Sequence, residues 1–212
     1  KSLDEIFYLG LNKNLNFVRV KKNNLHIGAA TPINDILVSL KKYYPEFYEM
    51  FERYGSEQIR NVASLGGNIG SASPIGDSLP VLISLDTKLV LDGNKSRKVS
   101  MSDYFVGYRQ TKLRKKEFIK EIIIPLKSRN NTLKCYKISK RIDDDISAVF
   151  MAINTEIKNN KFKTIKIVCG GVAAVPKIAK KTETYLKDKK INFDNIANAK
   201  KIISKEFSPL SD

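Results

Sequence analysis

The chain has 212 residues, enough for one large domain or two modest ones. Hydrophobic residues make up 42% of it, which is enough for a core, and no apolar run approaches the roughly 20 residues that a membrane-spanning helix needs. The net charge of +16 raises the possibility of a nucleic-acid-binding protein. The lysines are dispersed, however, and no nucleic-acid-binding motif accompanies them, so we expect most of this charge to be solvated surface.

The first elements in chain order are a hairpin and two helices. Strand-like segments at 17–20 and 25–27 flank Asn23 and Asn24, which predicts a β-hairpin. Thr31 as N-cap, with Pro32 at the first helical position, predicts a helix, and Pro45 predicts the start of a second one.

Residues 63–77 differ from the rest of the chain in having almost only small side chains and no charge before Asp77. They read Ala-Ser-Leu-Gly-Gly-Asn-Ile-Gly-Ser-Ala-Ser-Pro-Ile-Gly-Asp. Because small residues let a backbone approach a flat ligand closely, this small-residue segment is interpreted as a ligand-contacting loop. A tight turn of packed small residues is the alternative. The glycine spacing matches neither the G-x-G-x-x-G pattern nor a phosphate loop.

After the small-residue segment, a helix is predicted to start at Asp77 and to run to Leu85, so Asp77 is either an N-cap or a ligand contact. A second hairpin is expected around Gly93 and Asn94, and a strand at 118–124 is ended by Pro125.

The polar stretch 127–131 predicts a domain boundary, with domains at 1–127 and 131–212. Beyond it we expect three strands, at 133–139, 148–157 and 163–169, followed by helices at 177–188 and 195–204. Asn159 and Asn160 mark the turn between the second and third strands. An antiparallel sheet backed by helices fits this order.

Cys135 and Cys169 are too far apart and too few to indicate a disulfide framework or a metal site. We expect buried free thiols in a reducing cytoplasm. His26 is the only histidine, which argues against a structural metal site and a histidine-based catalytic triad.

Three motifs in order resemble the flavin-binding domain of xanthine dehydrogenase, a molybdenum hydroxylase. The first is Gln-Ile-Arg-Asn-Val-Ala-Ser-Leu-Gly-Gly-Asn-Ile at 58–69, followed by Ala-Ser-Pro-Ile-Gly-Asp at 72–77. The second is Tyr-Phe-Val-Gly-Tyr-Arg-Gln-Thr at 104–111. The third is Tyr-Lys at 136–137, continued by Lys-Arg-Ile-Asp-Asp-Asp-Ile at 140–146. The resemblance covers essentially the whole chain.

The resemblance implies an α+β fold. We expect the second lobe of a PCMH-type FAD-binding domain, a mixed sheet with helices, followed by a small C-terminal domain with a three-stranded antiparallel sheet packed on helices. The first, pyrophosphate-binding lobe is not matched, and the chain resembles a fragment truncated at both ends. We therefore expect it to bind FAD weakly or not at all by itself.

The function implied is that of the FAD-carrying module of a cytoplasmic xanthine dehydrogenase. Electrons from oxidised hypoxanthine or xanthine would pass from molybdopterin through 2Fe-2S clusters to FAD and then to NAD+. Molybdopterin and the clusters would belong to missing segments or to partners, a molybdenum-cofactor-binding large subunit and an iron–sulfur domain, in a hetero-oligomer without nucleic acid or membrane. The alternatives are a related hydroxylase acting on carbon monoxide, an aldehyde or an aromatic acid, a basic nucleic-acid-binding module, or an assembly fragment.

The resemblance also implies site residues. Ser64, Leu65 and Gly66 correspond to the loop that contacts the flavin nucleotide, and Gly67 and Asn68 complete it. Backbone N–H groups in such a turn suit an anionic or carbonyl oxygen.

Further cofactor contacts are implied outside that loop. Asp77 corresponds to an aspartate that hydrogen-bonds the cofactor. Tyr54 stands where the family often has a phenylalanine beside the flavin, with core packing as the alternative. Ile119 corresponds to a backbone contact or is a buried strand residue, and Lys137 is a cation near the flavin or a solvated lysine.

Two further pairs stand near the expected flavin. Arg141 and Asp144 fall in a loop that would shape access of NAD+, or they are surface charges. Tyr108 and Arg109 line the site, or they form a turn with a buried ring.

Overall fold

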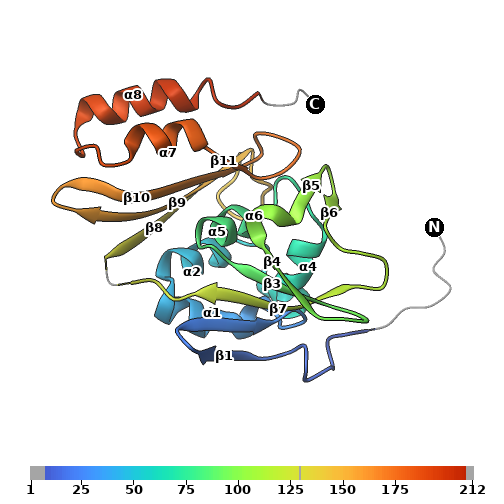
Figure 1. Cartoon of the computed structure of the whole chain (residues 1–212). Coiled ribbons are helices and arrows are strands. Elements are labelled where there is room, and N and C mark those ends of the chain that lie inside the picture. The colour runs from blue at the N-terminus through green and yellow to red at the C-terminus, as the bar shows by residue number, and fades with distance from the viewer. Residues whose placement is uncertain (1–7, 129, 209–212) are drawn as a thin grey trace.

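The computed structural model describes residues 8–128 and 130–208. It contains two main antiparallel sheets, with helices between them and on the outer face of the second sheet (Figure 1). The helices are α1 Ile33–Tyr43, α2 Pro45–Glu52, α3 Glu57–Val62, α4 Leu65–Gly70, α5 Ser78–Ser84, α6 Met101–Tyr104, α7 Lys180–Leu186 and α8 Phe193–Ile203.

The first sheet has five strands in the order β1-β2-β7-β3-β4. Its central strand carries the apolar run of 122–124, and Ile122 lies between Ile27 of β2 and Leu89 of β3, all three fully buried. The strands are β1 Val18–Lys21, β2 Asn24–Gly28, β3 Lys88–Asp92, β4 Arg97–Ser100 and β7 Phe118–Pro125. Both predicted hairpins and the predicted strand before Pro125 are confirmed.

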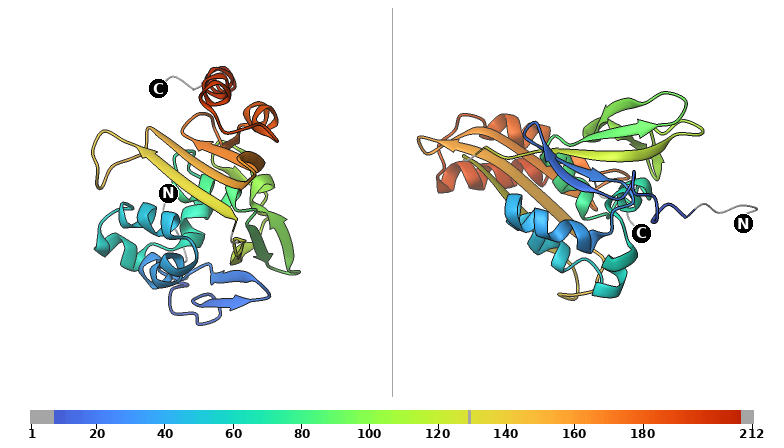
Figure 2. Two further views of the ribbon diagram at one scale, coloured as in Figure 1. Left: turned by 90° about the vertical axis from the view of Figure 1, so that its left-hand side faces the viewer. Right: turned by 90° about the horizontal axis from the view of Figure 1, so that it is seen from below.

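The second sheet has the order β11-β10-β9-β8, and α7 and α8 cover one of its faces (Figure 2). Asn159 and Asn160 both have positive φ angles and make the predicted turn between β9 and β10. The strands are β8 Asn131–Ile138, β9 Val149–Lys158, β10 Lys161–Gly170 and β11 Lys177–Ile178. A third, two-stranded sheet joins β5 Phe105–Gly107 and β6 Gln110–Thr111.

One hydrophobic core joins the two main sheets. Helix α5 is buried along its whole length and packs against β9 and β10. Leu133, Phe150 and Val168 of the second sheet belong to the same buried cluster as the apolar residues of α5. A smaller core lies between the second sheet and α7 and α8. The division into domains at 1–127 and 131–212 stays a prediction, and the two parts share a core.

The expected fold class is confirmed, with two differences in the sheets. Every described pairing in the five-stranded sheet is antiparallel, where we expected a mixed sheet, because β2 and β3 both pair antiparallel with β7. The second sheet has four strands rather than three. The additional strand, β11, has two residues and pairs with Val168 and Cys169. It occupies the first two positions of the predicted helix at 177–188, of which only 180–186 are helical, and so short a strand gives no alternation that could be recognised in the sequence.

Two predictions about local structure were wrong. Pro32, not Thr31, occupies the N-cap position of α1, and the Thr31 hydroxyl instead accepts a hydrogen bond from the backbone N–H of Phe17 at 3.0 Å. The small-residue segment was expected to be a loop, but its residues 65–70 form α4. Ser64 caps this helix, and burial of Leu65 and Ile69 offsets the poor helix propensity of the glycines.

Both cysteines are free thiols, as expected, although Cys135 is half-buried rather than buried. Burial raises the pKa of Cys135 to about 12 and that of Cys169 to about 11. Neither thiol is therefore set up as a nucleophile near neutral pH.

Candidate functional site

A cavity of about 480 Å³ lies beside α4, between the turn that precedes α1 and the start of β7. Ala29 and Ala30 line it on one side, Ser64 and Gly67 line it from α4, and Ile119 lines it from β7. We call it the α4 cavity. Its volume lies within the range of about 300–1,000 Å³ that is typical of small-molecule sites.

Three glycines of α4 border the cavity, and they differ in what surrounds them. A Cβ atom on Gly66 would lie 2.4 Å from the carbonyl oxygen of Ala29, so Gly66 is required for close packing of α4 against the end of β2. A Cβ atom on Gly67 would approach only Ser64 Oγ, at 3.1 Å, and one on Gly70 only Ile119 Cδ1, at 3.9 Å. Gly67 and Gly70 therefore present bare backbone to the cavity, as a flat ligand requires.

Two backbone N–H groups at the start of α4 already donate hydrogen bonds within the protein. The N–H of Gly66 donates to the carbonyl oxygen of Ala29 at 3.1 Å, and the N–H of Gly67 donates to Ser64 Oγ at 3.0 Å. Accepting this bond leaves the O–H of Ser64 available to donate into the cavity. The residues thus offer a hydroxyl and close backbone approach to a ligand, rather than the row of backbone N–H groups that the sequence suggested.

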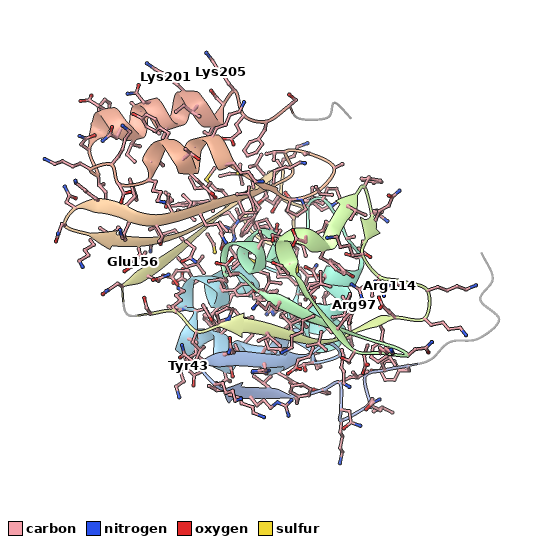
Figure 3. The ribbon with its side chains drawn as sticks, viewed as in Figure 1. Tyr43, Arg97, Arg114, Glu156, Lys201 and Lys205 are labelled. Carbon is pink, nitrogen blue, oxygen red and sulfur yellow. The ribbon has the colours of Figure 1, made fainter. Side chains whose placement is uncertain are left out.

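Glu117 lines the α4 cavity and is held by two partners. Arg97 of β4 donates two hydrogen bonds to its carboxylate, from Nε at 2.8 Å and from Nη2 at 2.7 Å, and the N–H of Arg114 donates a third at 2.9 Å. Arg97 and Arg114 lie together beside the start of β7 (Figure 3). The Arg97 guanidinium, followed by the Arg114 N–H, lowers the pKa of Glu117 to about 2.

The depressed pKa of Glu117 predicts a pH-dependent contribution to stability. A carboxylate whose pKa falls on folding contributes stability above its unfolded pKa of about 4.5, and that contribution is lost as the pH falls toward 2. We expect the wild type to be more stable than Glu117→Gln at about pH 7, and the difference to shrink between about pH 5 and pH 2. Urea midpoints measured across this range test this, and a difference independent of pH would contradict it.

The other predicted polar residues meet behind α4, at the junction of the two sheets. Asp77 Oδ2 accepts a hydrogen bond from Lys137 Nζ at 2.5 Å, and Asp77 Oδ1 accepts one from the Ser147 hydroxyl at 2.5 Å. The side chains of Asp77 and Lys137 are each only 6% exposed. The pair joins the start of α5 to β8, and Ser147 ties it to the segment before β9.

Asp77 does not cap α5 with its side chain. It occupies the N-cap position with helical backbone angles, but its side chain makes no capping hydrogen bond. Its carboxylate belongs instead to the ion pair with Lys137. Of the two roles considered for Asp77, the side-chain cap is excluded and the cofactor contact stays a prediction.

Tyr54 and Asn68 extend this polar group toward α4. Asn68 Nδ2 donates to the Tyr54 hydroxyl at 3.0 Å, and the Ser78 hydroxyl donates to Asn68 Oδ1. Burial raises the pKa of Tyr54, and the nearby charge of Asp77 raises it further. The ring of Tyr54 also packs edge-on against Phe51, with ring centroids 5.6 Å apart.

Eight of the nine predicted site residues therefore form two groups, and the ninth is a core residue. Ser64, Gly66, Gly67 and Ile119 line the α4 cavity. The side chain of Leu65 is fully buried in the core. The second group forms the polar cluster behind α4 and consists of Tyr54, Asn68, Asp77 and Lys137.

A second cavity, of about 540 Å³, lies next to this polar cluster. Ser147 lines it and links it to Asp77. Tyr108 and Arg109, which form the turn between β5 and β6, also line it, together with Lys140. Tyr108 is 58% exposed, so it is not the buried residue that one interpretation of the sequence suggested.

The predicted access loop borders the second cavity. Arg141 and Asp144 are both exposed, and the neighbouring Asp145 lines the cavity. Arg53, just after α2, fixes this loop by donating two hydrogen bonds to the carbonyl oxygen of Ile142, at 3.0 and 2.8 Å. The roles suggested for Arg141 and Asp144 stay predictions.

Sequence reasoning missed Glu117, Arg97 and Ser147. Their side chains take part in contacts between segments that are distant in the chain, and no local motif marks them. Within the described part of the chain, no group of three or more His, Cys, Asp or Glu side chains is placed to hold a metal ion. The helices described there include none that is long and apolar enough to cross a bilayer.

Two family models match the chain. Residues 3–127 match the FAD binding domain in molybdopterin dehydrogenase, and residues 134–212 match the CO dehydrogenase flavoprotein C-terminal domain. The chain therefore belongs to the FAD-binding modules of the molybdenum hydroxylase family, as the three motifs suggested.

Among curated proteins, the chain is similar to the glyceraldehyde dehydrogenase medium chain of Sulfolobus acidocaldarius. The two are 30% identical over 214 residues, which span 100% of this chain and 75% of that one. It is also similar to xanthine dehydrogenase of Oryza sativa subsp. japonica, with 31% identity over 196 residues, 84% of this chain but only 14% of the rice protein.

Among solved structures, the fold is similar to a chain of carbon monoxide dehydrogenase from Hydrogenophaga pseudoflava. The TM-score is 0.89 at 24% identity, covering 94% of this chain and 70% of that one. A chain of quinoline 2-oxidoreductase from Pseudomonas putida 86 gives a TM-score of 0.86 at 19% identity, with the same coverage. At these identities the likeness concerns the fold alone.

Proposed function

We propose that this chain carries FAD in the α4 cavity and that NAD+ bound in the second cavity would accept its electrons, which requires the flavin and nicotinamide rings to meet between the two cavities. The observation that carries the proposal is the α4 cavity itself, in a chain whose family binds FAD. The residues present fit the cofactor, because Gly67 and Gly70 leave backbone open to the cavity and Ser64 can donate a hydrogen bond there. When bound, FAD supplies the redox chemistry, accepting electrons singly and returning them as a hydride.

The polar cluster behind α4 has a positioning role in this proposal. The ion pair of Asp77 and Lys137 nearly cancels its own charge, and Ser147 completes the carboxylate's hydrogen bonds. Tyr54 and Asn68 connect this group to α4. The cluster thereby fixes the helix that borders the cofactor and the segment that borders the second cavity.

The second cavity has the charge that an anionic nucleotide requires. Arg109 and Lys140 line it, and only Asp145 opposes them among its described lining residues. The exposed ring of Tyr108 offers a surface on which a nicotinamide or adenine ring can stack. These features support NAD+ as the electron acceptor.

Replacing Arg109 tests the acceptor. In the assembled enzyme we expect Arg109→Gln to raise KM for NAD+ by roughly tenfold, because a charge-assisted hydrogen bond to phosphate is lost. The rate with ferricyanide, an acceptor that does not need this cavity, should stay within about twofold of the wild type. Equal losses with both acceptors would contradict the assignment.

For the parent enzyme we propose oxidation of hypoxanthine or xanthine, with electrons arriving from a molybdenum-cofactor-binding large subunit through an iron–sulfur domain. The three motifs and the similarity to the rice enzyme support this. The Sulfolobus medium chain, which this chain matches over its full length, favours an aldehyde as the second candidate. Turnover of the assembled enzyme on xanthine and on glyceraldehyde decides between the two.

Binding of FAD is tested by titration with the flavin fluorescence as the readout. In the assembled enzyme freed of its flavin we expect the fluorescence to be quenched on binding to the wild type. The affinity should fall by about tenfold in Gly67→Ala, whose methyl group would project into the cavity. A folded wild-type chain that shows no quenching at millimolar FAD, in the assembled enzyme as well as alone, would refute the proposal.

A further inference from the structure

The α4 cavity is lined by a charged residue to which the proposed function assigns no role. Among the described residues that line this cavity, Glu117 is the charged one. It lies two residues before Ile119, directly ahead of β7, so extended geometry directs both side chains to the same side of the strand. The side chain of Ile119 faces α4, because its Cδ1 would be the nearest atom to a Cβ placed on Gly70.

The carboxylate of Glu117 is ionised and held in one orientation. Arg97 donates a hydrogen bond to each carboxylate oxygen, and the Arg114 N–H donates a further one to Oε2. The side chain is only 9% exposed, so it has little freedom to turn away from a ligand. Arg97 offsets much of this charge at longer range, but a phosphate oxygen placed directly against a carboxylate oxygen would bring two hydrogen-bond acceptors together, which is unfavourable.

The same carboxylate can still accept a hydrogen bond. A carboxylate has about four acceptor positions. Oε1 accepts one bond, from Arg97 Nε, and Oε2 accepts two, from Arg97 Nη2 and the Arg114 N–H. Oε1 is therefore the oxygen with room for a donor from the ligand. The neighbouring walls at Leu15, Ala29 and Phe118 are apolar and suit the face of a base.

We infer that Glu117 sets the direction in which the dinucleotide lies, by accepting a hydrogen bond from the ribose hydroxyls of its adenosine half. This rests on the proposed binding of FAD in the α4 cavity. A carboxylate that holds the adenosine ribose is the device by which many dinucleotide-binding proteins select an unphosphorylated ribose. The pyrophosphate then lies away from Glu117, and nucleotides that carry a phosphate on this ribose are excluded.

Calorimetric titration with ADP, 2′-phospho-ADP and FMN tests the inference on the assembled enzyme freed of its flavin, because this chain by itself is expected to bind FAD weakly or not at all. In Glu117→Gln we expect ADP binding to weaken by roughly 10- to 100-fold, the usual cost of losing a hydrogen bond to a charged group. FMN, which lacks the adenosine half, should keep its affinity within about twofold. The preference for ADP over 2′-phospho-ADP should narrow in this variant, which a purely structural role of Glu117 would not cause.

Glu121→Gln is the matched control. Glu121 lies in β7, four residues after Glu117, and pairs with His26 and Arg19, but it does not line the α4 cavity. We expect this change to leave all three affinities as they are. If Glu117→Gln does not fold, Glu117→Asp takes its place, because it keeps the charge and should preserve discrimination against 2′-phospho-ADP while weakening ADP.

The outcomes separate this inference from the function on which it rests. If Glu117→Gln binds FAD with the same affinity as the wild type, the inference is wrong but the proposed function stands. Loss of FMN affinity with ADP unaffected would place Glu117 at the flavin and also overturn it. Failure of the assembled wild-type enzyme to bind FAD, ADP or FMN would overturn the proposed function and the inference together.

Discussion

Gly66→Ala should destabilise the protein by about 1–3 kcal/mol or more, whereas the same change at the adjacent Gly67 should leave the fold intact. At Gly66 the new Cβ would lie 2.4 Å from the Ala29 carbonyl oxygen and 2.6 Å from Ala29 Cβ. Because backbone on both sides is fixed by the Ala29–Gly66 hydrogen bond, the helix would have to move away from the end of β2. Urea unfolding of both variants measures this.

Gly67→Ala is the matched control for that change. Gly67 is exposed to the cavity, and its Cβ would meet only the hydroxyl oxygen of Ser64, at 3.1 Å. Alanine also has a helix propensity up to about 1 kcal/mol better than glycine. We therefore expect unchanged or slightly higher stability together with weaker FAD binding. Equal stability losses in the two variants would show that α4 is not packed as described.

Breaking the buried ion pair of Asp77 and Lys137 should also lower the stability of the protein strongly. Asp77→Asn keeps the shape of the side chain but leaves the Lys137 ammonium buried without its counter-charge. Breaking a buried pair in this way typically costs about 3–5 kcal/mol. The pair joins α5 to β8, so we expect faster hydrogen exchange in β8 and β9 as well as a lower urea midpoint.

An exposed pair provides the control for this prediction. Asp86 pairs with Lys166, but the Asp86 side chain is 71% exposed, so Asp86→Asn should change stability by about 1 kcal/mol or less. The double change Asp77→Asn with Lys137→Met should cost less than the sum of its two single changes, because it removes the uncompensated charge. Additive losses would mean that the two side chains do not interact.

The parts of the fold that local patterns encode could be predicted from the sequence. The Asn pair at 159–160 marks a hairpin turn and Pro45 marks the start of α2, both as expected. The first hairpin also forms, but its turn consists of Lys22 and Asn23, one residue earlier than the predicted Asn23 and Asn24. The small-residue segment was also correctly singled out as bordering a cavity, since Ser64 and Gly67 line one.

The parts that depend on tertiary contacts could not be predicted. Helix α4 forms in a glycine-rich stretch because Leu65 and Ile69 are buried in the core, which no local propensity shows. Asp77 and Lys137 are 60 residues apart in the chain, and Arg97 and Glu117 are 20 apart. Each residue alone reads as an ordinary surface charge or cap. The partners come together only through the packing of the two sheets and through the sheet order β7-β3-β4, which places β4 one strand away from β7.

The central claim is that FAD occupies the α4 cavity, and amide chemical-shift mapping during an FAD titration tests it most directly. It detects weak binding and reports where the ligand lies. The account predicts shifts concentrated at Ala29, Gly67 and Ile119, with Asn159 in the distant β9–β10 turn unaffected. Shifts centred on Tyr108 and Lys140, with the amides of α4 unchanged, would contradict it.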